Sequence, residues 1–375
     1  MNFRHVISTD QTADLTADLT ADLTADLTAD LAAAQSSRLV AVVVTHRRLA
    51  QLQVTLRSLL SAPLDQLAAV LVVDNASDKA TGAWLAAQTD PRLVVVRSDV
   101  NTGGAGGFAM GMKAAMERLA PDWIVLMDDD ARPKPGALRA FHALDLDAYD
   151  GFAAAVTLPD GTVCDMNRPT FNPFWRKRVM ARTLLGGGRE AFHLGPHDFK
   201  TPGLRTVDGT SFAAFFVRAS AVRKQGYPDP SLFLYGDDTL YTLGLTRAGH
   251  PIGFDPSVMF EHDNQTYSAA DPRIHPLWKV YYYYRNLLIV YRMSAGVFFA
   301  PVFILYLLRW LSRVRHYKGQ RGTYLRLFAM AMRDGLLRRT GISHDTVLNA
   351  ALNRPGVRGD TDATTAAPKP SAPTR

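Results

Sequence analysis

The chain has 375 residues, 47% of them hydrophobic, with a formal net charge of +7 and one cysteine, Cys164. This length suits a catalytic domain with a smaller accessory region, and a single cysteine excludes an internal disulfide. The N-terminal residues show no apolar segment of the kind found in secretory signals, so we expect a cytoplasmic location. Residues 273–339 contain 13 Lys or Arg and one acid, a net +12 that leaves 7 − 12 = −5 elsewhere, and this asymmetry indicates a surface for anions.

The two ends of the chain are compositionally biased. The tetrapeptide TADL recurs between Thr12 and Leu31, and we expect residues 1–36 to be disordered. Residues 353–375 are rich in Pro, Ala and Thr and are expected to be disordered as well. The chain between them divides into a region of alternating strands and helices, residues 37–265, and a basic, aromatic helical region, residues 266–352.

Four apolar, β-branched runs predict strands, and the segments between them include helical patterns. The predicted strands are Leu39–Thr45, Ala69–Asp74, Leu93–Arg97 and Trp123–Asp128, and the predicted helices are Leu49–Leu60 and Phe108–Leu119. Continuous apolar strands separated by helices predict an α/β fold, with a mostly parallel sheet covered by helices on both faces. Further along, residues 151–209 are irregular in pattern and predict loops and short strands that shape an acceptor pocket. Ser211–Val217 is strand-like, and residues 236–249 are helical in pattern.

Three consecutive aspartates, Asp128 to Asp130, follow the fourth apolar run. Adjacent carboxylates raise one another's pKa unless a cation neutralises them, and a divalent cation takes oxygen ligands. Alternate residues of an extended segment face the same side, so Asp128 and Asp130 are predicted to hold a metal while Asp129 faces elsewhere. The alternative is a solvated acidic turn paired with Arg132 and Lys134.

A glycine-rich segment, Asn101–Phe108 (NTGGAGGF), follows the third predicted strand. Like Asp74 and Asp128, it should lie at the carboxyl edge of the sheet, where ligands of such folds bind. Its G-x-G-x-x-A pattern, with Asp128 about 20 residues further on, fits a dinucleotide fingerprint, so an NAD-dependent oxidoreductase is one hypothesis. That fingerprint normally follows the first strand directly, which favours instead a backbone that approaches a phosphosugar.

Several segments, in their order along the chain, resemble the inverting family 2 glycosyltransferases. They are VVVTH at 42–46, VVDNAS at 72–77, NTGGAGG at 101–107, MDDD at 127–130 and FLYGDDTLYTLGLTRAG at 233–249. The resemblance covers about 60% of the chain and implies a GT-A fold for residues 37–265. It is nearest to the galactofuranosyltransferases, with rhamnosyltransferases close behind.

The resemblance also implies roles for particular residues. Asp128 and Asp130 match the metal-binding DxD pattern, and His262 matches a histidine that completes the metal site, for Mn²⁺ or Mg²⁺. Residues expected to bind the nucleotide sugar are Thr45, Arg47, Asp74, Asn75, Asn101, Gly103, Gly104, Asp128 and Asp129.

The acid pair Asp237 and Asp238 matches the family's general-base motif, with Asp238 as the base. An inverting transfer needs one carboxylate to take the proton of the acceptor hydroxyl, and a metal to stabilise the departing nucleoside diphosphate. Gly236 and Glu261 stand where galactofuranosyltransferases carry aromatic residues. The implied reaction moves galactofuranose from UDP-galactofuranose, or rhamnose from dTDP-rhamnose, to a glycan.

The region from Pro276 to about residue 340 combines aromatic, apolar and basic residues, as in WKVYYYYR at 278–285. The apolar run Ala295–Leu308 is shorter than the roughly 20 residues that cross a bilayer. We therefore expect helices on a membrane surface, at the inner face of the cell membrane, with basic side chains on anionic lipid. This favours a glycan or polyprenyl-linked acceptor and no nucleic acid. Homo-oligomerisation, a re-entrant hairpin and a non-catalytic lipid- or RNA-binding adaptor are left open.

Overall fold

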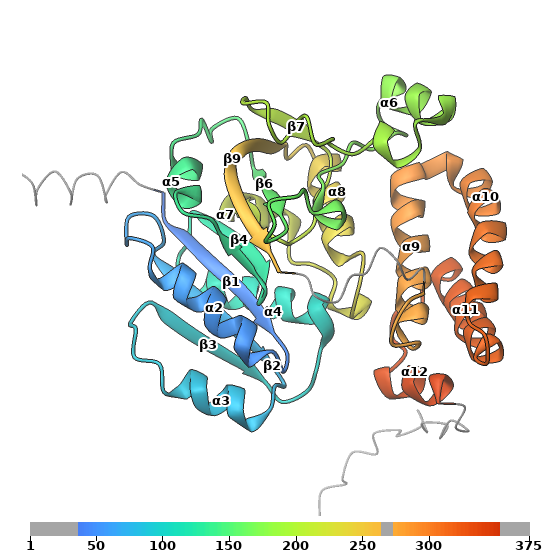
Figure 1. The fold of residues 1–375 in the computed structure, drawn as a ribbon, viewed down its shortest axis with the longest axis horizontal. Coiled ribbons are helices and arrows are strands. Elements are labelled where there is room, and N and C mark those ends of the chain that lie inside the picture. Colours follow the sequence, from blue (N-terminus) through green and yellow to red (C-terminus); the bar gives the residue numbers. More distant parts are fainter. Residues whose placement is uncertain (1–36, 264–272, 353–375) are drawn as a thin grey trace, which may run out of the picture.

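The computed structural model describes residues 37–263 and 273–352 (Figure 1). The predictions of disorder for residues 1–36 and 353–375 concern segments outside the described residues. Within the described chain, an α/β lobe that contains one large sheet lies beside a smaller region of helices (Figure 1).

The sheet has nine strands in the order β3-β2-β1-β4-β8-β6-β9-β5, with β7 paired to β9. The strands are β1 Leu39–Thr45, β2 Ala69–Asn75, β3 Leu93–Ser98, β4 Trp123–Asp128, β5 Ala131–Pro133, β6 Gly151–Thr157, β7 Arg205–Val207, β8 Phe215–Arg218 and β9 Ile252–His262. Strands β1 to β4 are mutually parallel, whereas β8 runs antiparallel to both β4 and β6. The α/β class is confirmed, and the sheet as a whole is mixed.

Each strand of the parallel half alternates its side chains between two apolar layers. Ala41 and Val43 of β1 belong to a core beneath α2 (Leu49–Leu60), α3 (Lys79–Ala86) and α5 (Ala137–His142). Val42 and Val44 belong to a second core beneath α4 (Gly103–Arg118), α7 (Ala219–Gln225) and α8 (Asp237–Arg247). Helices therefore cover both faces, which explains why β1, β2 and β4 are apolar up to their polar last residues.

One stretch agrees with its prediction and one differs. The segment 151–209, expected to form loops and short strands, contains the short strands β6 and β7, and both pair with β9. The glycines of the segment 101–108 lie in the first turns of α4, which begins at Gly103 rather than at Phe108. Close packing explains this start, because a Cβ on Gly107 or Gly111 would meet Val44 or Val42 at 2.5 Å. Close contact with the strands outweighs the poor helix propensity of glycine here.

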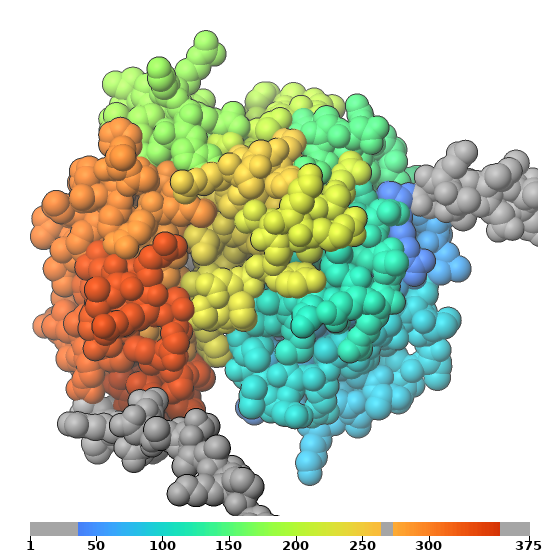
Figure 2. Space-filling view, turned by 180° about the vertical axis from the view of Figure 1, so that it is seen from behind, coloured from blue at the N-terminus to red at the C-terminus, as the bar shows by residue number. Residues whose placement is uncertain are grey.

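The helical region beyond residue 273 has a core of its own, which confirms its predicted helical character. It consists of α9 (Lys279–Ala295), α10 (Phe299–Ser312), α11 (Arg321–Leu336) and α12 (His344–Ala351). Viewed from behind, these helices, in orange and red, pack against the yellow segment that contains α8 (Figure 2).

Lys279–His316 is long and apolar enough to cross a membrane by length and composition, with a mean hydropathy of 1.9 in its most apolar window. Only 22% of that window is buried. Gly296, which ends α9 with φ 52°, divides the segment, and α10 folds back beside α9 (Figure 1). Large apolar side chains on this hairpin face outward, including Val297 at 91% and Leu305 at 72% exposure.

Candidate active site

The pairing of β5 with β9 brings the aspartate cluster and the distant histidine together. Strand β4 ends at Asp128, the chain turns through Asp129 and Asp130, and Ala131 then pairs with His262 in the antiparallel ladder. The backbone N–H of Asp263 donates to the carbonyl of Asp130 at 2.9 Å. A three-residue strand therefore places side chains more than a hundred residues apart in the sequence on one side of the sheet edge.

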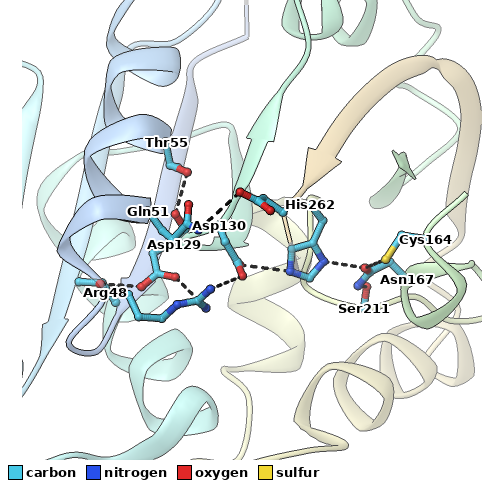
Figure 3. Close-up of polar contacts among 11 residues, drawn as sticks. Arg48, Gln51, Thr55, Asp129, Asp130, Cys164, Asn167, Ser211 and His262 are labelled. Carbon is cyan, nitrogen blue, oxygen red and sulfur yellow. Dashed lines mark hydrogen bonds and ion pairs between the residues drawn. The ribbon is translucent and has the colours of Figure 1, made fainter. Parts of the chain in front are cut away.

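Asp128, Asp130 and His262 each offer one ligand atom, and these atoms lie within 4.8 Å of one another. The His262 ring contacts Asp130 Oδ1 through Nε2 at 3.1 Å and Asn167 Oδ1 through Nδ1 at 2.8 Å (Figure 3). Since the amide oxygen of Asn167 can only accept, Nδ1 carries the hydrogen and Nε2 faces the carboxylates. Two carboxylates and one imidazole nitrogen in this arrangement fit a divalent cation such as Mn²⁺ or Mg²⁺.

The side chain of Asp129 points away from the other two carboxylates. Thr45 donates to its Oδ2 at 2.7 Å. Arg48 lies 3.1 Å from its Oδ1 (Figure 3). The expectation that Asp129 faces elsewhere is thus met. The side chains of Asp129 and Thr45 contact each other, and their expected contact with the donor stays a prediction. Arg48 also pairs with Asp130 at 2.6 Å, and we infer that it holds the acidic turn in place. The alternative partner Arg132 binds Glu261 instead.

Burial and the neighbouring charges together set the pKa values of this cluster. It raises the pKa of Asp128 to about 6 and that of Asp129 to about 7. Burial also acts to raise the pKa of Asp130, but the hydrogen bond from His262 and the charges of His262 and Arg48 hold it below its usual value. Conversely, burial acts to lower the pKa of His262, and the hydrogen bond with Asp130 raises it to about 10. A cation must therefore displace a proton from Nε2, so its affinity should rise with pH.

Residues at the ends of β1 and β2 support the turns beside the start of α4. Asn75 donates to the carbonyl of Gly103 at 2.8 Å and accepts from the N–H of Thr102 at 2.9 Å, which fixes the start of α4. Asp74 is buried and accepts from the N–H of Ser77 at 2.9 Å, so its side chain stabilises the turn after β2. Arg47, by contrast, is exposed with φ 57°.

Gly103 and Gly104 play different structural parts at the beginning of α4. Gly103 has φ 71°, and a Cβ there would lie 1.9 Å from the carbonyl oxygen of Phe233. Gly104 would place its Cβ in open space, with no atom within 4 Å, and its backbone lines a cavity. Asn101, which is exposed, accepts from the N–H of Gly103 at 2.9 Å. The segment thus presents backbone to the cavity at Gly104 and packs tightly at Gly103.

Helix α8 begins with the acid pair. Both acids line the cavity that Gly104 also lines, which has a volume of about 710 Å³. Asp237 is buried, and burial followed by the charge of Asp238 raises its pKa well above the usual value. Burial also raises the pKa of Asp238, although Thr239 donates to its Oδ1 at 2.6 Å from the backbone. The cavity is lined in part by Asp128, His262, Gly104, Asp237 and Asp238.

Most of the residues chosen from the sequence therefore converge. Asp128, His262, the acid pair and Gly104 line one cavity, and Asp130 joins it only through the cluster with Asp128 and His262. Asp74, Thr45 and Asp129 are buried in supporting contacts. Arg48 and Asn167 were missed. Arg48 stands three residues beyond the first strand, a position that could have indicated it, but Asn167 lies in a loop with no motif around it.

The sequence profile of glycosyl transferase family 2 matches residues 40–195. The chain is 33% identical over 230 residues to galactofuranosyltransferase GlfT1 of Mycolicibacterium smegmatis, which covers 59% of this chain and 70% of that protein. It is 26% identical over 280 residues to galactofuranosyltransferase GlfT2 of Mycobacterium tuberculosis, covering 70% of this chain and 42% of that longer protein.

Among solved structures, GalNAc-T7 with UDP, GalNAc and Mn²⁺ matches with a TM-score of 0.49 and 13% identity, over 68% of this chain and 48% of that one.

Proposed function

The chain belongs to glycosyl transferase family 2, and on that premise we propose that it transfers galactofuranose from UDP-galactofuranose, with inversion, to a hydroxyl of a lipid-linked or cell-envelope glycan. The observation that carries the proposal is that the cluster of Asp128, Asp130 and His262 opens onto the cavity that the acid pair lines. Asp128 and His262 of this cluster line that cavity together with Asp237 and Asp238. Membership also excludes the NAD hypothesis, and the ligand cluster together with the acid pair argues against a non-catalytic adaptor. The glycines belong to α4 after the third strand, and Asp128 lies in the carboxylate–histidine cluster.

The donor diphosphate belongs at the carboxyl ends of β1, β2 and β4. Asp128, Asp130 and His262 would hold Mn²⁺ or Mg²⁺, which when bound stabilises the negative charge that develops on the departing UDP. The Asn75 side chain fixes the start of α4, and the backbone at Gly104 then faces the donor. Arg48 keeps the carboxylate of Asp130 ionised and oriented.

Asp238 is the group we assign to proton removal. A single displacement at the anomeric carbon needs one base on the acceptor side, within hydrogen-bond reach of the attacking hydroxyl. Asp238 lies at the N-terminus of α8 and lines the cavity that also contains Asp128, so an acceptor there has a carboxylate on one side and the donor on the other. Its raised pKa makes it a better proton acceptor than an exposed aspartate.

A membrane surface is the partner that we assign to the helical hairpin of α9 and α10. Its outward side chains include Val297, Ile304, Leu305 and Leu308, all more than 60% exposed. The basic residues of the region 273–339 add attraction for anionic lipid. The same cavity extends from Asp238 to Val302 and Leu305 on the hairpin, which supports an acceptor with an apolar part. We place this surface at the inner face of the cell membrane.

The test is a panel of sugar donors with Mn²⁺, Mg²⁺ or EDTA and a polyprenyl-linked glycan acceptor. We expect transfer from UDP-galactofuranose, dependence on a divalent cation, and an anomeric configuration in the product opposite to that of the donor. Turnover of dTDP-rhamnose alone would replace the donor and leave the site assignment in place. Equal transfer in EDTA, or retention of configuration, would overturn the proposal.

A further inference from the structure

The loop before the acid pair, residues 231–236, has a strained backbone. Phe233, Tyr235 and Gly236 have φ values of 64°, 70° and 78°, and two of these carry side chains that rarely adopt this region. The loop ends where α8 begins, at Asp237, so its conformation sets where both carboxylates lie. Such a segment persists only when contacts from elsewhere hold it.

Two neighbouring residues of α9 supply those contacts. The side-chain amide of Asn286 donates to the carbonyls of Leu232, Leu234 and Tyr235 at 3.0, 2.9 and 2.8 Å. Arg285 donates to the carbonyl of Leu232 at 2.7 Å through Nη2, and to the Asn286 amide oxygen at 2.7 Å through Nε. Buried backbone carbonyls of a loop need such partners, and here one asparagine satisfies several at once.

The pair is itself fixed within the helical region. Arg285 is completely buried, and its guanidinium lies over the rings of Tyr281 and Tyr282 at 5.2 and 5.1 Å. Helix α11 packs so closely that a Cβ on Gly335 would meet the carbonyl oxygen of Arg285 at 2.8 Å. Arg285 Nη1 is buried without a hydrogen-bond partner among the described residues.

The same loop also reaches the donor side. The carbonyl of Phe233 accepts from the N–H of Ala105 in α4 at 3.2 Å, and it occupies the space that a side chain on Gly103 would need. Helix α9 therefore contacts, through one loop, both the start of the acid pair and the helix that faces the donor.

We propose that Arg285 and Asn286 are positioning residues for the acid pair, so that α9, assigned above to a membrane surface, is also part of the transfer site. The kinetic consequence rests on the proposed function, whereas the structural consequence does not. Loss of the Asn286 amide should let the loop relax, which moves Asp237 and Asp238 relative to the acceptor and leaves the metal cluster in place.

The test compares Asn286→Ala with Tyr284→Phe. The hydroxyl of Tyr284 makes a buried hydrogen bond to Tyr324 at 3.1 Å, two residues from Asn286 on the same helix and away from the loop. We expect kcat of Asn286→Ala to fall about 100-fold with UDP affinity in Mn²⁺ unchanged, since small displacements of reacting groups have effects of this size. Tyr284→Phe should keep kcat. Arg285→Lys, which retains the cation, should retain part of the rate and provides the result if Asn286→Ala does not fold.

Hydrogen exchange of the backbone amides in residues 232–240 gives a readout independent of turnover. It should be about tenfold faster in Asn286→Ala than in Tyr284→Phe, because local opening rather than global unfolding exposes the loop. If the unsubstituted protein transfers no sugar, but the amides of the loop still exchange faster in Asn286→Ala than in Tyr284→Phe, the positioning role holds and the proposed function is wrong. Unchanged exchange and unchanged kcat in Asn286→Ala, in a protein that does transfer sugar, would overturn the inference.

Discussion

The two sides of the cavity are built in different ways. On the donor side, strands β1 to β4 are parallel, and Asn75, Gly104 and Asp128 stand at or within a few residues of the ends of β2, β3 and β4. His262 is the one donor-side residue that comes from far along the chain, through the pairing of β5 with β9. On the acceptor side, the acid pair depends on α9, some fifty residues further along the chain. Apart from His262, the donor side is therefore a product of local folding, whereas the acceptor side depends on long-range packing.

This difference predicts which substitutions should change ligand affinity and which should change the rate of turnover. Changes on the donor side should act mainly on nucleotide and metal affinity, whereas changes at α8 and α9 should act on the rate of transfer. The predictions that follow test this division, beginning with the largest effect.

Asp238→Asn should abolish transfer, with kcat lower by about 1,000-fold, because it removes the proton acceptor without removing any group from the donor side. UDP binding in Mn²⁺, measured by calorimetry, should not change. Asp237→Asn is the matched variant, and its kcat should fall less. A greater loss in Asp237→Asn would exchange the roles of the two acids.

Asp130→Ala should weaken UDP binding about 100-fold in Mn²⁺ and leave binding in EDTA unaffected, because only the metal-mediated part of the affinity depends on this carboxylate. Calorimetric titration with and without the chelator makes the measurement. An equal loss in both conditions would mean that Asp130 acts through the fold, for example through its ion pair with Arg48, and not through a cation.

Gly103→Ala should lower the free energy of unfolding by about 2 kcal/mol, because a side chain there meets the Phe233 carbonyl and φ is positive. Gly104→Ala is the control one residue away, where the added methyl group meets nothing. Urea denaturation of both variants tests the contrast. Similar losses in the two variants would argue against the described contact between α4 and the loop 231–236.

Asn167→Leu should reduce Mn²⁺ affinity about tenfold, since it removes the acceptor that fixes the His262 ring. Ser211→Ala removes only the partner of the Asn167 amide nitrogen and should have a smaller effect. Competition with a fluorescent chelator measures both. An unchanged Mn²⁺ affinity in Asn167→Leu would show that the ring needs no such partner.

The sequence predicted the donor half closely, because apolar runs and their polar ends report local structure. Strands β1 and β4 and helix α2 have the predicted bounds, and Asp128, Asp130 and His262 do come together. Strand β9 was not predicted, because Asp255, Pro256 and Ser257 interrupt its apolar pattern.

Asn167, Arg285 and Asn286 were not predicted for a related reason. Their partners are backbone carbonyls or side chains far away in the sequence, which no spacing reveals. Gly236 has a structural explanation that the sequence did not provide. Its φ of 78° at the start of α8, with Val290 of α9 3.2 Å from where a Cβ would be, accounts for a glycine before the acid pair.

The hydrogen bonds from Asn286 to the loop 231–236 have a practical consequence for chimeras. If the loop 231–236 were exchanged between relatives without α9, it would be separated from Asn286, which holds its conformation. The segment 40–195 that matches the family profile contains neither the loop 231–236 nor α9. Specificity in this scaffold should therefore be inherited, or engineered, as a linked pair of segments.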